Sequence, residues 1–191
     1  MQFKRAGKFI LNKLQLELPA HLSYHGIDHT LDVYAAAEKI ANVEGISNYE
    51  QKLLLTAALF HDAGFIKMRY GHEEESCRIV CQYLPLYGYQ PAQIDMICGM
   101  IMATRVPQSP YTHLEEILCD ADLDYLGRDD FFMLSSRLLS ELRYEGLIKD
   151  ESEWNREQAD FIEGHCYHTV TSLKLRQAKK KEYIKLVKSK I

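Results

Sequence analysis

The sequence lacks several features that define other classes of protein. None of its apolar stretches is long enough to span a membrane, and polar and charged residues interrupt the apolar stretch 9–18. We therefore expect an amphipathic helix there, no signal peptide and no membrane partner. The formal net charge is −4 and no basic stripe with interleaved aromatic residues is present, so no nucleic acid partner is expected. The basic segment 174–188 is interpreted as a solvated helical tail, with a binding patch as the alternative.

Cysteine is too sparse and too irregularly spaced for a disulfide framework. The chain has five cysteines, an odd number, and no CxxC pair. Most of them fall at apolar helical positions, so we interpret them as reduced core residues of a cytoplasmic protein. The cysteines are Cys77, Cys81, Cys98, Cys119 and Cys166.

Internal repeats, low-complexity tracts and clusters of proline or glycine are also lacking, so no linker divides the chain. A chain of 191 residues can bury one sizeable core. No segment alternates apolar and polar residues for long enough to predict a strand, and the periodicity is helical nearly throughout. The sequence therefore predicts an all-α, single-domain helical bundle over residues 1–191. The expected helices cover residues 3–18, 27–44, 49–62, 72–85, 91–104, 113–126, 129–148 and 153–187, the last of them kinked or divided.

Among the residues that are present, His61 and Asp62 are the most informative. They end a nearly continuous apolar run, residues 53–60, and therefore come from the end of a buried helix. An unpaired buried charge costs several kcal/mol, so an imidazole and a carboxylate in this position need partners. A metal ion is a partner that both groups can share.

Helical geometry selects two further candidates for the same site. At 100° per residue, His29 lies on the apolar face of its helix and points inward. Asp122 also shares a face with apolar residues, which makes it the buried member of the series Asp120, Asp122 and Asp124. We assign Asp120 and Asp124 to the surface or the end of the helix.

Two imidazoles and two carboxylates on three helices suit a first-row divalent ion. Mn, Fe, Co, Ni or Zn fits this donor set better than Mg²⁺ or Ca²⁺, which prefer oxygen alone. Four protein ligands leave open positions on a six-coordinate ion, as catalysis requires. The residues therefore predict one divalent metal ion held by His29, His61, Asp62 and Asp122.

With these four residues the sequence resembles the HD-domain metal-dependent phosphohydrolase superfamily, whose pattern is H…HD…D on a bundle of helices. The resemblance covers about residues 20–145 and is closest to small stand-alone members that carry an acidic box after the HD loop. The segments that carry it are Tyr24-His25-Gly26-Ile27-Asp28-His29, His61-Asp62, His72-Glu73-Glu74-Glu75-Ser76, Ala103-Thr104 and Asp120-Ala121-Asp122-Leu123-Asp124-Tyr125-Leu126-Gly127.

The resemblance implies an all-α domain, with the C-terminal helices of 153–187 packed on it, and a divalent metal held by the four ligands. It also implies hydrolysis of a phosphate ester or anhydride, frequently of a nucleotide. Two-metal members add histidines after the HD loop. His72 matches the first such position, but the region after Thr104 reads Arg105-Val106-Pro107 without a second histidine. We therefore expect one metal ion, and the same absence argues against oxygenase chemistry at a di-iron site.

The acidic box supplies candidates for the catalytic base. Glu73 lies one turn back from the apolar stripe of its helix and therefore points inward, so it is the first candidate. Glu74 is the second, and Asp62 counts as catalytic through the metal it would hold. The alternative is that these glutamates only stabilise the N-terminus of the helix through its dipole.

Cationic and histidine side chains supply candidates for substrate binding. Basic groups can neutralise charge that develops on a phosphate, with ordinary surface positions as the alternative. His25 is either a pocket residue or a partner that orients His29. The candidates are His25, Lys67, Arg69, His72 and Arg105.

The predicted function is hydrolysis of a small phosphorylated compound, a nucleotide or a related molecule, by a metal-activated water. The alternative is a regulatory domain that binds a metal and a nucleotide without hydrolysis. A homodimer is a further possibility that the sequence leaves open.

Overall fold

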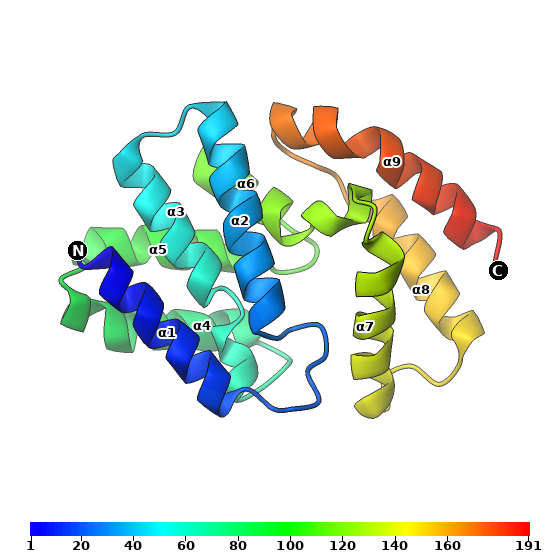
Figure 1. Ribbon diagram of the computed structural model, residues 1–191, viewed down its shortest axis with the longest axis horizontal. Helices are drawn as coiled ribbons and strands as arrows, with labels where there is room; N and C mark the ends of the chain where they lie inside the picture. Colours follow the sequence, from blue (N-terminus) through cyan, green and yellow to red (C-terminus); the bar gives the residue numbers. More distant parts are fainter.

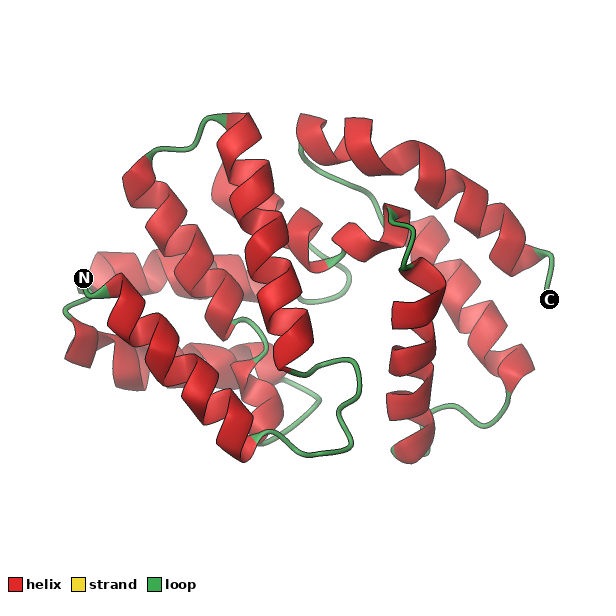
Figure 2. Cartoon of the chain, in the orientation of Figure 1, coloured by secondary structure: helices red, strands yellow, loops and turns green.

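Helices are the only regular elements of the computed structural model, which describes residues 1–191 (Figure 2). This confirms the predicted all-α class. The α-helices are α1 (Phe3–Glu17), α2 (Ile27–Glu44), α3 (Asn48–Phe60), α4 (His72–Tyr83), α5 (Pro91–Ala103), α6 (His113–Asp122), α7 (Phe131–Tyr144), α8 (Glu151–Gly164) and α9 (Val170–Lys188). Three short 3-10 helices join them, namely η1 (Ala63–Ile66), η2 (Leu84–Tyr87) and η3 (Asp124–Gly127).

Most expected helices agree with the structure to within a few residues. The helix expected over 113–126 is divided, and the helix expected over 153–187 to be kinked or divided is also divided. The expected helix 113–126 leaves helical geometry at Leu123, with φ −109° and ψ 20°, and continues as η3. The expected helix 153–187 is two helices, α8 and α9, separated by the extended residues after Gly164. The helix expected to include His61 and Asp62 ends at Phe60. These two residues therefore lie at a helix end, where a side chain can turn toward a site.

The N-terminal bundle forms around α3. Each of the eight residues from Leu53 to Phe60 is buried, because α1, α2, α5 and α6 all pack against this helix. Its start is fixed by a capping box in which the Ser47 hydroxyl accepts from the Glu50 backbone N–H and the Glu50 carboxylate accepts from the Ser47 N–H. The C-terminal end of α3 is therefore buried, and it places His61 inside the bundle core.

The C-terminal helices surround a second apolar cluster. α7, α8 and α9 lie together on one side of the molecule, beyond α2 and α6 (Figure 1). Their apolar side chains pack with those of η3, including Leu126, Phe131 and Ile162. α9 contacts α8, η3 and α2, and so ties this part to the bundle.

Asp120 and Asp124, assigned to the surface or the end of the helix, are both buried, so a surface position is wrong for both. Asp120 is fully buried and accepts hydrogen bonds from the backbone N–H groups of His168 and Thr169, each at 2.8 Å. Asp124 is buried in a two-bond pair with Arg176, at 2.6 and 2.9 Å. The helical-angle test failed because α6 and η3 lie between two apolar clusters and therefore have more than one buried side.

The interpretation of the cysteines as core residues holds only for Cys119. Cys77 and Cys98 are half-buried, whereas Cys81 and Cys166 are exposed, and no disulfide is present. On α4 the apolar stripe is carried instead by Ile79 and Val80, so Cys81 falls on the solvent side.

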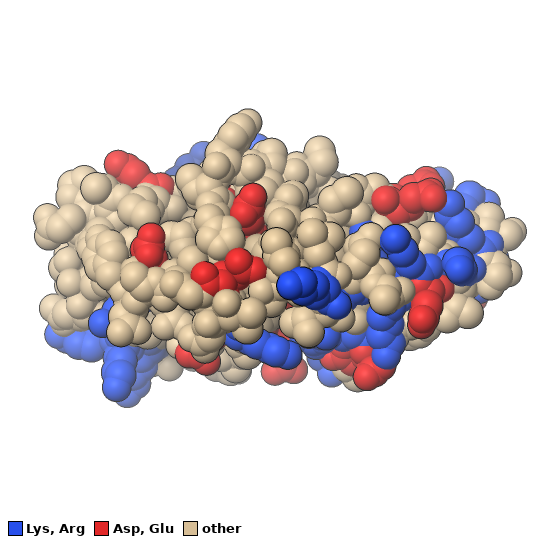
Figure 3. All heavy atoms as spheres, turned by 90° about the horizontal axis from the view of Figure 1, so that it is seen from above, with Lys and Arg blue, Asp and Glu red and all other residues tan.

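The basic segment 174–188 does not form a continuous basic surface. Acidic side chains lie among the basic ones at the C-terminal end of the molecule (Figure 3). Lys188 pairs with Glu163 at 2.6 Å, which fits a solvated helical face. Lys180 departs from that expectation, since it is buried and its ammonium lies 3.0 Å from His165 Nδ1. None of the helices combines the length and apolar character that crossing a membrane requires.

Candidate metal centre

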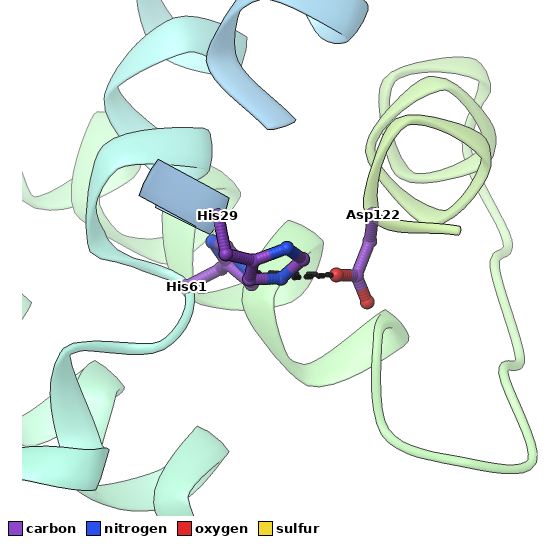
Figure 4. A group of neighbouring side chains, drawn as sticks. All are labelled: His29, His61 and Asp122. Atoms are coloured by element: carbon purple, nitrogen blue, oxygen red, sulfur yellow. Dashed lines mark hydrogen bonds and ion pairs between the residues drawn. The ribbon is translucent and has the colours of Figure 1, made fainter. Parts of the chain in front are cut away.

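The predicted metal ligands meet at one point between α2, α3 and α6. His29 and His61 face each other and the Asp122 carboxylate approaches both rings (Figure 4). His29 Nε2 lies 3.2 Å from Asp122 Oδ1 and 3.4 Å from His61 Nε2. Asp62 Oδ2 lies 3.2 Å from His61 Nε2 and 3.4 Å from His29 Nε2. The structure therefore brings together all four side chains selected from the sequence.

The spacing of these donor atoms fits a shared ion. Nitrogen and oxygen ligands lie about 2.0–2.2 Å from a zinc-like ion, so neighbouring ligand atoms are about 2.8–3.6 Å apart at octahedral or tetrahedral angles. The distances among the histidine nitrogens and carboxylate oxygens of this group run from 3.2 to 3.5 Å. The cluster of His29, His61 and Asp122 could thus hold a metal ion.

The His61 ring is held in the tautomer that a metal requires. Its Nδ1 lies 2.8 Å from the Ala58 carbonyl oxygen and donates its proton there. Nε2 points into the cluster, and it is the nitrogen that carries the lone pair in the neutral form of the ring, the form that binds a metal. Such a backbone contact to the outer nitrogen is the usual way in which proteins orient a ligating histidine.

One carboxylate oxygen is left without a hydrogen-bond donor. Asp62 Oδ2 is buried and has no hydrogen-bond partner. The nearest nitrogen is His61 Nε2, at 3.2 Å. A buried unpaired carboxylate oxygen is costly, and a cation in the cluster would satisfy it.

The charges around the cluster call for a positive ion. Burial opposes protonation of His61, yet Asp62 and Asp122 outweigh it and hold the pKa of His61 well above its ordinary value. Burial of Asp62 disfavours its ionised form, but His61 and then His72 hold the pKa of Asp62 well below its usual range. Burial of Asp122 also disfavours its ionised form, but hydrogen bonds from His29 and His61 outweigh burial and lower the pKa of Asp122. Both carboxylates are therefore ionised, and the centre attracts cations.

His72 and Glu73 extend the centre from the first turn of α4. His72 Nδ1 lies 2.7 Å from the Arg69 carbonyl, so its Nε2 faces inward, 3.4 Å from Asp62 Oδ1 and 3.6 Å from Glu73 Oε1. Glu73 is only 7% exposed, as its inward angle predicted. Its other oxygen lies 3.4 Å from Arg105 Nη2. A carboxylate is therefore held beside the metal ligands without being bonded to them.

Close packing against Gly64 positions α4. The Gly64 backbone N–H donates to the Ser76 hydroxyl at 2.8 Å, and that hydroxyl donates to the His61 carbonyl at 2.6 Å. A Cβ added at Gly64 would come within 2.0 Å of the His72 carbonyl oxygen. Only glycine allows this approach.

Replacing Gly64 by alanine is therefore expected to push the start of α4 away from the metal ligands. The free energy of unfolding should fall by about 2–3 kcal/mol, since backbone atoms have to move to relieve the overlap. Urea unfolding of the variant measures this loss, and Gly164→Ala is the matched control, because nothing lies near a Cβ added there. A Gly64→Ala protein with wild-type stability would show that His72 is not held by this contact.

A buried network connects His25 and Arg69 to α7. Glu141 has a fully buried side chain and accepts from the backbone N–H groups of Tyr24 and His25, at 2.9 and 3.0 Å. It also accepts from the His25 ring at 2.5 Å and pairs with Arg69. Arg69 is paired as well with Glu145, so its charge is already balanced. Both predicted substrate residues line the cavity described below, but in fixed positions.

The sequence analysis missed Glu141. A detectable signal was present, because Glu141 lies seven residues after Leu134 and three after Leu138 and so shares their helical face. A carboxylate on an apolar stripe needs a partner. The partners of Glu141 come from the loop before α2 and the loop after η1, and the sequence does not indicate that these loops lie against α7.

The remaining predicted residues are less close to the centre. Lys67 pairs with Glu75 and its side chain is 60% exposed, and it does not line the cavity. Glu74 also lies outside the lining, in a pair with Arg105. Arg105 itself lines the cavity, between Glu73 and Glu74.

The centre opens into a cavity of about 680 Å³. Asp62, His72, Glu73 and Asp122 line one part of it, and residues of α7 and α8 line another. The cavity therefore gives a small molecule access to the cluster, with Arg69 and Arg105 in its wall.

The fold is thus an all-α bundle with a histidine and aspartate centre that faces a cavity. A sequence model described as HD domain matches residues 26–124, just over half of the 191 residues. The chain belongs to the HD domain family, so the resemblance to the superfamily of metal-dependent phosphohydrolases is confirmed. No functionally curated protein matches the sequence significantly.

Several solved structures share this fold. A predicted HD superfamily hydrolase from an uncultured Thermotogales bacterium has 21% identity and a TM-score of 0.64 over 95% of this chain and 89% of that one. A protein from Lactobacillus plantarum has 20% identity and a TM-score of 0.71, with 99% and 96% covered. Bacillus subtilis YpgQ, solved in complex with ADP, has 20% identity and a TM-score of 0.63, with 100% and 97% covered. At these identities the similarity establishes the fold.

Proposed function

We propose that this protein is a divalent-metal-dependent hydrolase of a small phosphorylated compound. The observation that carries the proposal is the convergence of His29, His61 and Asp122, together with the unpartnered oxygen of Asp62, at the head of a cavity. When bound there, a divalent ion supplies a Lewis acid for a phosphate oxygen and a water of lowered pKa. The cavity is lined by both the N-terminal bundle and the C-terminal helices, so we propose that residues 1–191 act as one functional unit.

The chain's own groups would divide the remaining work. Glu73 is buried beside the ligands, where it can receive a proton from the attacking water. His72, with Nε2 directed inward, and Arg105, beside Glu73, are placed to contact phosphate oxygens. Arg69 and His25, held by Glu141, form a rigid part of the wall. Lys67 faces Glu75, and we assign it no part in the reaction.

Glu73→Gln is expected to lower kcat by at least about 100-fold, because a positioned general base contributes about 10²–10⁴-fold. The metal content of the variant should stay at the wild-type level, since Glu73 is outside the ligand set. Glu74→Gln is the matched control: its side chain lies outside the cavity lining, and kcat should change by less than about threefold. Equal loss in both variants would contradict the assignment of Glu73.

A substrate panel tests the reaction itself. Protein loaded with Mn²⁺, Co²⁺, Fe²⁺, Ni²⁺ or Zn²⁺ is assayed against phosphomonoesters, nucleotides and other phosphoanhydrides, beside Asp62→Ala. Nucleotides belong in the first panel because the similar protein YpgQ was solved with ADP. Turnover by the wild type and none by the variant supports the proposal.

The competing proposal is a regulatory domain that binds a metal and a nucleotide without hydrolysis. It is favoured by the pairing of Arg69 and Arg105 with glutamates, which leaves little free positive charge for a transition state. Tight nucleotide binding without turnover under every metal would establish it and reject the hydrolase.

A further inference from the structure

The cavity at the metal centre has two chemically different halves. Its inner half holds the ionisable groups, including Asp62, Asp122 and Glu73. Its outer half runs between α7 and α8 and the segment that joins them. The outer half is lined mainly by Leu138, Leu142, Leu147, Ile148, Trp154 and Phe161.

An aromatic wall connects the two halves. The Phe65 ring lies 4.2 Å, between centroids, from both His72 on the metal side and His25, which is bonded to Glu141 of α7. Phe65 thus contacts a residue beside the metal ligands and a residue bonded to α7, and these contacts hold α7 at a fixed distance from the metal centre. A molecule can therefore extend from the centre along Phe65 into the outer half.

The outer half offers little hydrogen bonding to a bound molecule. Of its polar side chains, Gln158 is already bonded to the Ser135 hydroxyl, and Glu157 is exposed to solvent. A nucleobase and ribose would lose hydrogen bonds to water there and find few replacements. An aliphatic or aromatic group would lose none.

The cavity side of α7 is also incompletely covered. Leu138 and Leu142 lie on the apolar stripe of this helix but are only half-buried, whereas Phe131 at its start is fully buried against η3 and Tyr183. Apolar surface that faces a cavity gains free energy when an apolar ligand displaces water from it. The uncovered part of the stripe coincides with the outer half of the cavity.

We propose, on the basis of the hydrolase function above, that the outer half is a binding subsite for an extended apolar group of the phosphorylated substrate. The phosphate lies at the His29, His61, Asp62 and Asp122 centre, and the apolar group lies between α7 and α8. The substrate class is then a phosphate ester or anhydride of a long aliphatic or aromatic alcohol.

Trp154 provides a direct readout of this subsite. It is the only tryptophan of the chain, it is buried and it lines the outer half. Its fluorescence is followed while zinc-loaded protein is titrated with methyl, butyl, hexyl and octyl phosphonates, which cannot be hydrolysed. Each methylene that enters the subsite should tighten binding about three- to fourfold, the factor that corresponds to burial of one methylene. Linear alcohols of the same chain lengths, titrated without metal, should show the same increase in affinity per methylene.

A variant pair localises the effect. Leu147→Gln replaces a cavity residue that is 37% exposed, so the fold should tolerate it, and it should weaken octyl phosphonate binding at least about threefold with methyl phosphonate binding unchanged. Leu139→Gln is the control, since Leu139 is a half-buried residue of α7 outside the cavity lining, and it should change neither.

The outcomes separate this inference from the proposed function. Affinity that rises with chain length supports the subsite, whether or not any phosphate is hydrolysed. Affinity independent of chain length, or a nucleoside phosphonate that binds more tightly than octyl phosphonate, overturns the subsite even if short phosphates are turned over. If the wild-type protein hydrolyses no phosphate but affinity still rises with chain length, only the proposed hydrolase function is rejected.

Discussion

Replacing His61 by alanine is expected to remove the metal ion from the purified protein and to reduce phosphate hydrolysis to the background rate. The imidazole is 1% exposed and its Nε2 is within 3.5 Å of His29, Asp62 and Asp122, so no water-exposed group can take its place. Loss of a residue that merely orients a ligand costs about 10–100-fold in metal affinity, and loss of the ligand itself should exceed that. Elemental analysis after dialysis gives the metal content directly.

The metal dependence of stability checks the same assignment. A ligand that binds only the folded state raises its stability by about 2.7 kcal/mol at 100 times Kd. The wild-type Tm should therefore rise with added Zn²⁺ or Mn²⁺, and that of His61→Ala should not. His113→Ala is the matched control, because His113 is exposed and pairs with Glu116 away from the centre. Equal metal content in His61→Ala and wild type would refute the centre.

Glu141→Gln is expected to destabilise the fold by about 3 kcal/mol, because breaking a buried charged pair is strongly destabilising and His25 loses its carboxylate partner as well. For a chain of this size the Tm should fall by about 6–12 °C. Glu145→Gln is the control, since Glu145 contacts the same Arg69 but its side chain is 19% exposed, and its loss should cost less than about 1 kcal/mol. In an Arg69→Met background the effect of Glu141→Gln should shrink, and an unchanged effect would contradict the pairing.

The same substitution should alter the response to acid. Burial opposes ionisation of Glu141, but hydrogen bonds from His25 and from the backbone of Tyr24 outweigh it and lower its pKa to about 2, from 4.5. A carboxyl whose pKa is lower in the folded state stabilises the fold fully above its unfolded pKa. That contribution is lost as the pH falls from about 4.5 through about 2. Urea unfolding should therefore show a wild-type advantage over Glu141→Gln at neutral pH that narrows steadily below about pH 4.5.

The local features of the site followed from the sequence. Apolar periodicity placed His29 and Glu73 on inward faces, and both are buried. The apolar run 53–60 predicted a buried helix with His61 and Asp62 at its end, over residues 49–62, and α3 ends two residues earlier, at Phe60. These predictions depend only on the direction of a side chain relative to its own helix, which is a local property.

Predictions that depended on a second element were less successful. Asp120 and Asp124 were assigned to the surface or the end of the helix from one apolar face of α6, whereas His168 and Thr169 cover Asp120 and α9 packs on η3, where Asp124 lies. Lys67 and Arg69 were candidates for phosphate binding, with surface positions as the alternative, and the sequence did not predict their pairing with Glu75, Glu141 and Glu145.

The sequence by itself determined that the chain is helical and which four side chains are suited to hold a metal. Residue type and helical period are enough for that, because both are fixed within a single segment. Only the tertiary structure decided that these donors lie 3.2–3.5 Å apart, that Glu141 holds His25 and Arg69, and that an apolar cavity extends between α7 and α8. The physical reason is that distances between helices follow from the packing of side chains distant in sequence, which no single segment encodes.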